Sequence, residues 1–158
     1  MGIRIQFLGS GDAYASGGRL QTCILVEGMG PRFVFDCGAT ALAAMRTRDV
    51  DPNHVGLILL THLHGDHFSG VPFFIIDATD ASGREKPLTI AGPPGTRARI
   101  EALGDVLFPG MWNREVRFPL TFVEMTPETP YDFDGLTVTP YPVAHSPAAN
   151  PTGEWATG

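Results

Sequence analysis

Long apolar runs are absent from this 158-residue sequence. No stretch of about 18 apolar residues is present, so the sequence offers no candidate membrane-spanning helix. Residues 3–8 begin as an alternation of apolar and polar residues, which predicts a first strand and no signal peptide. Position 6 is glutamine, where a myristoylation signal requires serine or threonine. We therefore expect a cytoplasmic protein with no membrane partner.

Cysteine and basic charge are also scarce. The two cysteines, Cys23 and Cys37, lie in apolar, strand-like runs, and in the cytosol we expect them to be buried thiols, not metal ligands. Lysine and arginine number 11 against 17 aspartates and glutamates, for a net charge of −6. This acidic balance disfavours a protein that binds nucleic-acid phosphate. A small phosphate ester is still compatible with it, because bound metal ions would reverse the local charge.

The composition is that of a globular chain. Hydrophobic residues make up 43% of the sequence and charged residues 18%, and the length suits one domain over residues 1–158. Apolar periodicity predicts strands at 3–7, 22–27, 32–36, 55–60, 88–91, 120–125 and 136–143. It predicts helices at 39–48, 68–79 and 96–108, the last capped by Thr96. Residues 80–87, which include Arg84, favour a polar, solvated loop.

This order of elements predicts an α/β fold of the α+β type, with a mixed sheet. The early strands form an antiparallel hairpin, and the later strands alternate with helices, which we expect on one face of the sheet. The other face needs a cover. Nothing in the sequence obviously supplies one.

The densest chemical signal lies at residues 61–67, directly after the apolar run 55–60. Residues i and i+2 of an extended segment face the same side, so His62 and His64 can bind one metal ion together. Gly65 allows the backbone to turn, which aims Asp66 and His67 at a second position nearby. Imidazole and carboxylate ligands suit zinc, and also iron or manganese. We therefore predict a metal site here and not merely a histidine-rich polar loop.

The sequence His-Leu-His-Gly-Asp-His at 62–67 resembles the HxHxDH signature of the metallo-β-lactamase-fold hydrolases. Three further segments resemble the ribonuclease Z and cyclic-nucleotide phosphodiesterase branch: Phe-Leu-Gly-Ser-Gly-Asp at 7–12, Val-Phe-Asp-Cys-Gly at 34–38 and Val-Ala-His-Ser at 143–146. The likeness extends over residues 1 to 148. It implies that the chain is the N-terminal half of a four-layer αββα metallo-β-lactamase sandwich.

The resemblance also implies a set of metal ligands. Those of the first metal would be His62, His64 and His145. Those of the second would be Asp66 and His67. Asp36 would lie beneath the site and orient a ligand, as residues behind metal ligands commonly do. The alternative role for Asp36 is a turn residue that caps the following helix.

The chemistry that these ligands imply is hydrolysis by metal-activated water. Three neutral imidazoles leave zinc an open fourth position, where water has a pKa near 7. Asp66 can hold the second metal and also orient that water or accept its proton, so we expect it to be catalytic. The expected cofactor is Zn²⁺, as one or two ions, with Mn²⁺ or iron as alternatives.

The expected substrate is a phosphodiester, either a cyclic nucleotide or an RNA 3′ end. The acidic charge favours the small phosphodiester over a large RNA. The same site could act on a thioester, a lactone or a β-lactam. A metal-binding or interaction module without turnover is a further alternative.

The sequence departs from the family in its second half. Family members continue past the third histidine and there supply a bridging aspartate and a final histidine, whereas no aspartate follows Asp134 here and no histidine follows His145. We favour a fragment or truncated form of a longer enzyme. A half-protein completed by self-association or by a partner, and a remnant without activity, stay open. In each case the uncovered sheet face predicts a homo-oligomer or a partner that covers it.

Overall fold

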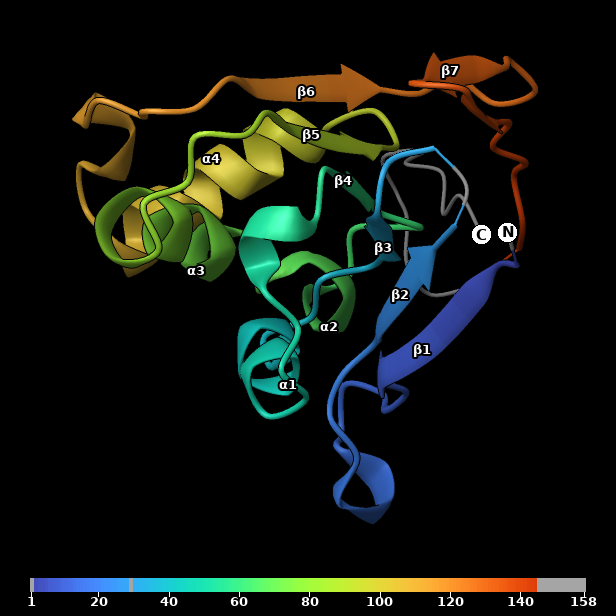
Figure 1. Ribbon diagram of the computed structural model, residues 1–158, viewed down its shortest axis with the longest axis horizontal. Coiled ribbons are helices and arrows are strands. Elements are labelled where there is room, and N and C mark those ends of the chain that lie inside the picture. The colour runs from blue at the N-terminus through green and yellow to red at the C-terminus, as the bar shows by residue number, and fades with distance from the viewer. Residues whose placement is uncertain (1, 29, 145–158) are drawn as a thin grey trace.

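A six-stranded mixed sheet forms the centre of the structure (Figure 1). The computed structural model describes residues 2–28 and 30–144, and the statements below concern these residues. The strands, in spatial order, are β1 (Arg4–Gly9), β2 (Cys23–Glu27), β3 (Phe33–Phe35), β4 (Leu57–Leu59), β5 (Leu88–Gly92) and β6 (Leu120–Glu124). The first three strands are antiparallel, and β3 to β6 are parallel. The predicted mixed α/β architecture is therefore confirmed.

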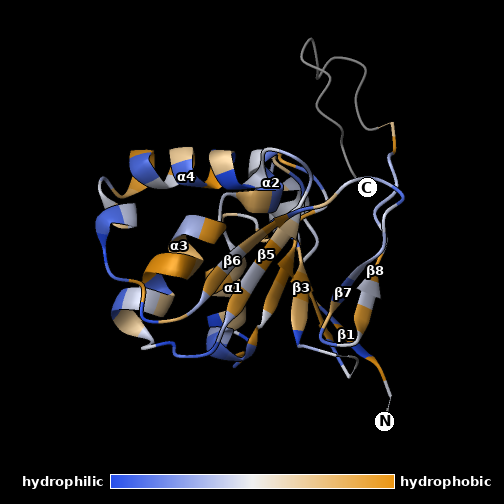
Figure 2. Cartoon of the chain, turned by 90° about the horizontal axis from the view of Figure 1, so that it is seen from above, coloured by the Kyte–Doolittle hydropathy of each residue, from blue (hydrophilic) through white to orange (hydrophobic). Residues whose placement is uncertain are grey.

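The helices pack on one face of this sheet (Figure 2). They are α1 (Ala41–Arg46), α2 (Gly65–Phe68), α3 (Val71–Ile76) and α4 (Thr96–Leu107), with a π-helical turn η3 (Asp77–Ala81) after α3 and single 3₁₀ turns at η1 (Ser16–Gly18), η2 (Pro52–His54) and η4 (Met111–Asn113). None of the described helices has the length and apolar run that crossing a membrane needs.

The larger core lies between the sheet and these helices. Leu25, Ile58 and Ile90 project from three strands into one buried cluster. Phe74 of α3 and Ile100 of α4 meet them there. Alternate strand residues share a face, so this cluster takes every second apolar residue of each strand and leaves the others for the opposite face.

Two helix predictions need correction. The helix predicted over 68–79 is interrupted at Gly70, whose N–H donates to the carbonyl of Cys37. A Cβ at Gly70 would lie 2.2 Å from the carbonyl oxygen of Gly38, so only glycine permits this approach. Thr96 does not cap α4. The cap is Gly95, at φ 89°, and the Thr96 hydroxyl donates instead to the carbonyl of Pro93.

A small hairpin covers part of the opposite face of the sheet (Figure 2). It consists of β7 (Tyr131–Phe133) and β8 (Leu136–Val138), joined through Asp134 and Gly135, both at positive φ. The expectation that nothing in the chain covers this face is therefore wrong. The strand predicted over 136–143 ends at Val138, before two prolines at 140 and 142 that cannot donate to a ladder.

The cover is incomplete. Leu136 of the hairpin packs in a second buried cluster with Leu57, Leu59 and Met125. Farther along the same sheet, Ile5 and Phe7 on β1 are 59% and 62% exposed. The face that β1 presents beyond the hairpin is thus apolar and open in the described part of the chain.

Arg84 corrects the prediction of a solvated loop over 80–87. Its side chain is 1% exposed and donates to the backbone carbonyls of Pro52, Val55, Lys86 and Pro87. Its guanidinium also lies over the ring of Phe118, 5.5 Å from the centroid. Arg84 therefore ties this loop to the segment that leads into β4.

Candidate metal centre

The predicted site lies where β3 and β4 end. These strands are parallel neighbours, so their carboxyl ends meet at one edge of the sheet, where ligand sites of α/β proteins commonly form. Asp36 follows β3, and its N–H donates to the carbonyl of Leu59, the last residue of β4. The histidine segment follows β4 directly and enters α2 at Gly65.

The structure brings His62 and His64 together. Their Nε2 and Nδ1 atoms are 3.1 Å apart, and the two rings meet edge to face with centroids 4.7 Å apart. The i, i+2 spacing predicts this convergence of two ring nitrogens. His62 is buried, with 7% of its surface exposed.

The structure also pairs Asp66 with His67. Both residues belong to α2, and Oδ2 of Asp66 lies 3.3 Å from Nε2 of His67. The ring of His67 is 4.0 Å from that of His62, measured between centroids. Two donor pairs, one of two nitrogens and one of an oxygen and a nitrogen, therefore lie next to each other.

Asp36 lies behind both pairs. It is 2% exposed, and its backbone has φ 59°, a left-handed conformation that aspartate tolerates better than most residues. His67 Nδ1–H donates to Oδ2 at 2.7 Å, and the N–H of Thr61 donates to Oδ1 at 2.8 Å. Helix α1 begins only at Ala41, so Asp36 does not cap it.

Burial and the neighbouring carboxylates shift the pKa of His67 in opposite directions. Burial lowers the pKa of His67, whereas the hydrogen bond that His67 donates to Asp36 and the charges of Asp36 and Asp66 raise it, and the net shift is upward. The two carboxylates thus favour positive charge at this point. A divalent cation is compatible with the same electrostatic environment.

The described donors suit a metal ion, although no three of the described histidine, cysteine, aspartate and glutamate side chains form a joint cluster. The third predicted ligand of the first metal, His145, lies outside the described residues. Cys23 and Cys37 are buried and unpaired in the structure. Burial and the nearby charge of Asp36 raise the pKa of Cys23 to about 12, so it stays a thiol.

Thr61 is the residue of this site that the sequence pattern does not reveal. Its hydroxyl lies 3.0 Å from both carboxylate oxygens of Asp36 and 3.0 Å from Nδ1 of His62. A threonine before the first histidine is indistinguishable from any loop threonine in a sequence. Only its position in the fold identifies it, between Asp36, which is 25 residues away in sequence, and the adjacent His62.

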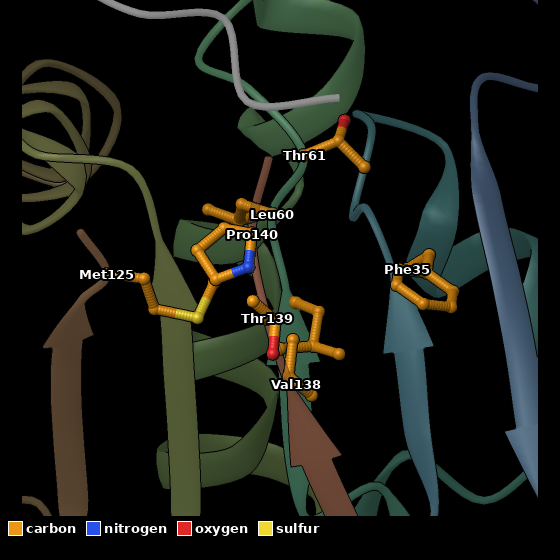
Figure 3. A pocket seen from close by; sticks show the side chains of 8 residues that line it. Phe35, Leu60, Thr61, Met125, Val138, Thr139 and Pro140 are labelled. Atoms are coloured by element: carbon orange, nitrogen blue, oxygen red, sulfur yellow. The ribbon is translucent and has the colours of Figure 1, made fainter. Parts of the chain in front are cut away.

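An apolar pocket adjoins the site on the hairpin side (Figure 3). Its volume is about 110 Å³, and it is lined by Phe35, Leu59, Leu60, Thr61, Met125, Val138, Thr139 and Pro140. The lining brings together strand ends of the large sheet, the end of β8 and the segment that follows it. The pocket offers an apolar surface beside the donors, with Thr61 at the boundary between the two.

Comparison with known proteins gives consistent matches. The family model described as Anti-Pycsar protein Apyc1 matches residues 3–156. Ribonuclease Z of Methanococcus maripaludis is 33% identical over 147 residues, which are 91% of this chain and 46% of that protein. The chain therefore spans about half the length of this relative.

Solved structures agree with the sequence matches. The short form of human tRNase Z gives a TM-score of 0.65 at 29% identity, over 78% of this chain and 46% of that one. The metallo-β-lactamase-fold protein YhfI of Bacillus subtilis gives a TM-score of 0.64 over 90% of this chain and 55% of that one, and its 15% identity bears on the fold alone. With a family model matched over almost its whole length, the chain belongs to the Anti-Pycsar protein Apyc1 family and has the metallo-β-lactamase fold of the ribonuclease Z-like branch.

Proposed function

We propose that this chain carries the histidine-rich part of a metal-dependent hydrolase site that cleaves a phosphodiester. The observation that carries the proposal is the convergence of His62 Nε2 and His64 Nδ1, beside the Asp66 and His67 pair. Neutral imidazole nitrogens and a carboxylate oxygen are the donors that a catalytic zinc site uses. Ribonuclease Z relatives with the same fold support hydrolysis as the reaction class.

The proposed division of labour follows from the donor pairs. His62, His64 and His145 hold a first divalent ion, and Asp66 and His67 hold a second. A bound divalent ion supplies Lewis acidity and lowers the pKa of water towards 7. Asp66 orients the attacking water and accepts its proton. We propose Zn²⁺ as the ion, with Mn²⁺ or iron as alternatives.

A small phosphodiester, such as a cyclic nucleotide, is the proposed substrate. The net charge of −6 disfavours the large polyanion that an RNA 3′ end belongs to. The second candidate is nevertheless that RNA end, because relatives of this chain are named ribonuclease Z and tRNase Z. A thioester, lactone or β-lactam would require the same donors, so substrate panels must include them.

Buried, unpaired cysteines support a cytoplasmic location.

The test is His64→Ala, assayed for hydrolysis of bis(p-nitrophenyl) phosphate and for bound metal by elemental analysis. We expect the wild-type chain to bind metal and hydrolyse the ester, and the variant to lose both together. His54→Ala is the matched control, because His54 lies in η2 with a side chain 53% exposed and away from the donors. Unchanged activity in His64→Ala would refute the assignment.

We also propose that another polypeptide covers the open face of the sheet. Ile5 and Phe7 on β1 and Phe35 on β3 leave an exposed apolar surface beyond the hairpin. In the purified chain, the covering polypeptide is expected to be a second copy. Light scattering should therefore show an oligomer that Phe7→Ser weakens, with Tyr14→Ser, at an exposed residue outside this face, as control. A stable wild-type monomer would contradict the proposal.

A further inference from the structure

The carboxylate of Asp36 is the point where two of the histidines are connected. It receives His67 Nδ1–H directly, at 2.7 Å. It also accepts hydrogen bonds from Thr61, from the backbone N–H at 2.8 Å and from the hydroxyl, which lies 3.0 Å from each carboxylate oxygen. The same hydroxyl lies 3.0 Å from Nδ1 of His62. Asp36 is therefore linked directly to His67 and, through the Thr61 hydroxyl, indirectly to His62.

The direction of each hydrogen bond follows from the chemistry of the groups. An ionised carboxylate accepts hydrogen bonds and donates none, so the single proton of the Thr61 hydroxyl goes to Asp36. The hydroxyl oxygen can then only accept from His62, which makes Nδ1 of His62 the protonated nitrogen. The same reasoning makes Nδ1 the protonated nitrogen of His67. In His62 the lone pair is consequently on Nε2, the nitrogen that faces Nδ1 of His64. In His67, Nδ1 is held by Asp36, and Nε2 is the nitrogen that faces Asp66.

We propose that Thr61 is a positioning residue whose hydroxyl connects the Asp36 carboxylate to His62 by two hydrogen bonds in series, a relay. One buried aspartate thereby sets the tautomer and ring orientation of two metal ligands, His67 directly and His62 through Thr61. The inference rests on the proposed function, because it gives His62 and His67 their role as ligands. A histidine ligand with the wrong tautomer presents N–H to the metal in place of a lone pair. Groups that hold the second ring nitrogen commonly change metal affinity by 10- to 100-fold when they are removed.

The proposed role belongs to the Thr61 hydroxyl and is separate from the contact that its backbone makes. The backbone N–H of Thr61 bonds to Asp36 whatever the side chain is, so the turn after β4 keeps that contact in any variant except proline. Valine has nearly the shape of threonine but no hydroxyl, and serine has the hydroxyl but no methyl group. The pair Thr61→Val and Thr61→Ser therefore separates the hydrogen bond from the packing.

The experiment measures the affinity of the full chain for Zn²⁺ by competition with a chromogenic chelator. Thr61→Val is expected to bind Zn²⁺ at least about 10-fold more weakly than wild type, and Thr61→Ser within about three-fold of it. Thr79→Val is the control, because it also removes a threonine hydroxyl bond, from Oγ1 to the carbonyl of Ile75, but away from the site. Its Zn²⁺ affinity should equal that of wild type.

A second measurement requires no variant. Nitrogen-15 NMR of the metal-free wild-type chain distinguishes Nδ1–H from Nε2–H imidazoles, and His62 should be the Nδ1–H tautomer, while Nδ1 of His67 should also carry a proton. In Thr61→Val, His62 should become a mixture of tautomers while His67 stays unchanged. The wild-type spectrum is independent of activity, and it tests the tautomer of His62 even if the variant folds poorly.

The outcomes separate the inference from the function on which it rests. If wild type binds no Zn²⁺, the proposed function fails. If wild type binds Zn²⁺ and Thr61→Val binds it equally well, the relay is wrong while the function stands. Equal losses in Thr61→Val and Thr61→Ser would also overturn the relay, since packing would then explain both. An Nε2–H tautomer for His62 in the metal-free wild type would overturn it directly.

Discussion

Arg84→Met is expected to destabilise the protein strongly, although the residue lies in a loop. Four backbone carbonyls accept hydrogen bonds from the Arg84 side chain, at 2.6 Å for Pro87, 2.7 Å for Val55 and Lys86 and 3.1 Å for Pro52. The carbonyl of Pro52 keeps a second donor, the N–H of Val55. Three carbonyls therefore lose the donor that Arg84 supplies.

The magnitude follows from these three acceptors. A buried polar group left without its partner costs about 1–3 kcal/mol, and the exposed position of Lys86 and Pro87 lets water replace part of the loss. Methionine fills most of the volume and removes a desolvated charge, which offsets some of the cost. We expect a net loss of about 3 kcal/mol in the free energy of unfolding, or roughly 6–12 °C in Tm for a chain of this size.

The assay is thermal and urea unfolding of the metal-free protein, followed by circular dichroism. Arg84→Lys should fall between wild type and Arg84→Met, because an ammonium has donors at one atom and cannot span the carbonyls that the guanidinium fork reaches. Arg19→Met is the matched control, since Arg19 is exposed and bonds to one carbonyl, that of Ser16. If Arg84→Met unfolds within about 1 kcal/mol of wild type, the reasoning that buried carbonyls depend on this side chain is refuted.

Two further predictions concern the packing around the candidate site. Gly70→Ala should lower the unfolding free energy by about 1–3 kcal/mol, because its Cβ would collide with the backbone carbonyl of Gly38, whereas Gly65→Ala, with nothing within 4 Å of the added atom, should be nearly neutral in the metal-free protein. Equal urea midpoints for the two variants would contradict this contact. The thiols of Cys23 and Cys37 should not react with a disulfide reagent at pH 8 in the folded protein, because burial raises the pKa of both. Two thiols per chain should react in guanidinium chloride, and rapid labelling without denaturant would count against their burial.

Local patterns in the sequence predict much of the fold. Alternating apolar residues indicate the strands, and the hairpin of β2 and β3 forms where glycine and proline separate two such runs. The same local logic fails at β7. The Asp-Gly pair at 134–135 is a strong hairpin signal, but the strands on either side are only three residues long. Such short strands give a weak periodic pattern.

The metal-binding residue types are also a local property. His62 and His64 converge because an extended backbone sends i and i+2 to one side, which a sequence encodes directly. Asp66 and His67 come together within one short helix. The sequence therefore determined the identity of the donors and their pairing, and through its motifs it determined the family.

Only the tertiary structure decided what lies behind these donors and what surrounds them. Asp36 and Thr61 are 25 residues apart, and they meet because β3 and β4 are parallel neighbours with their ends in register. Arg84 becomes a buried anchor because loops 29 and 32 residues away in sequence supply its acceptors. Such contacts depend on the order of strands in the sheet. Residue spacing along the chain carries no information about a partner that the fold brings from another element.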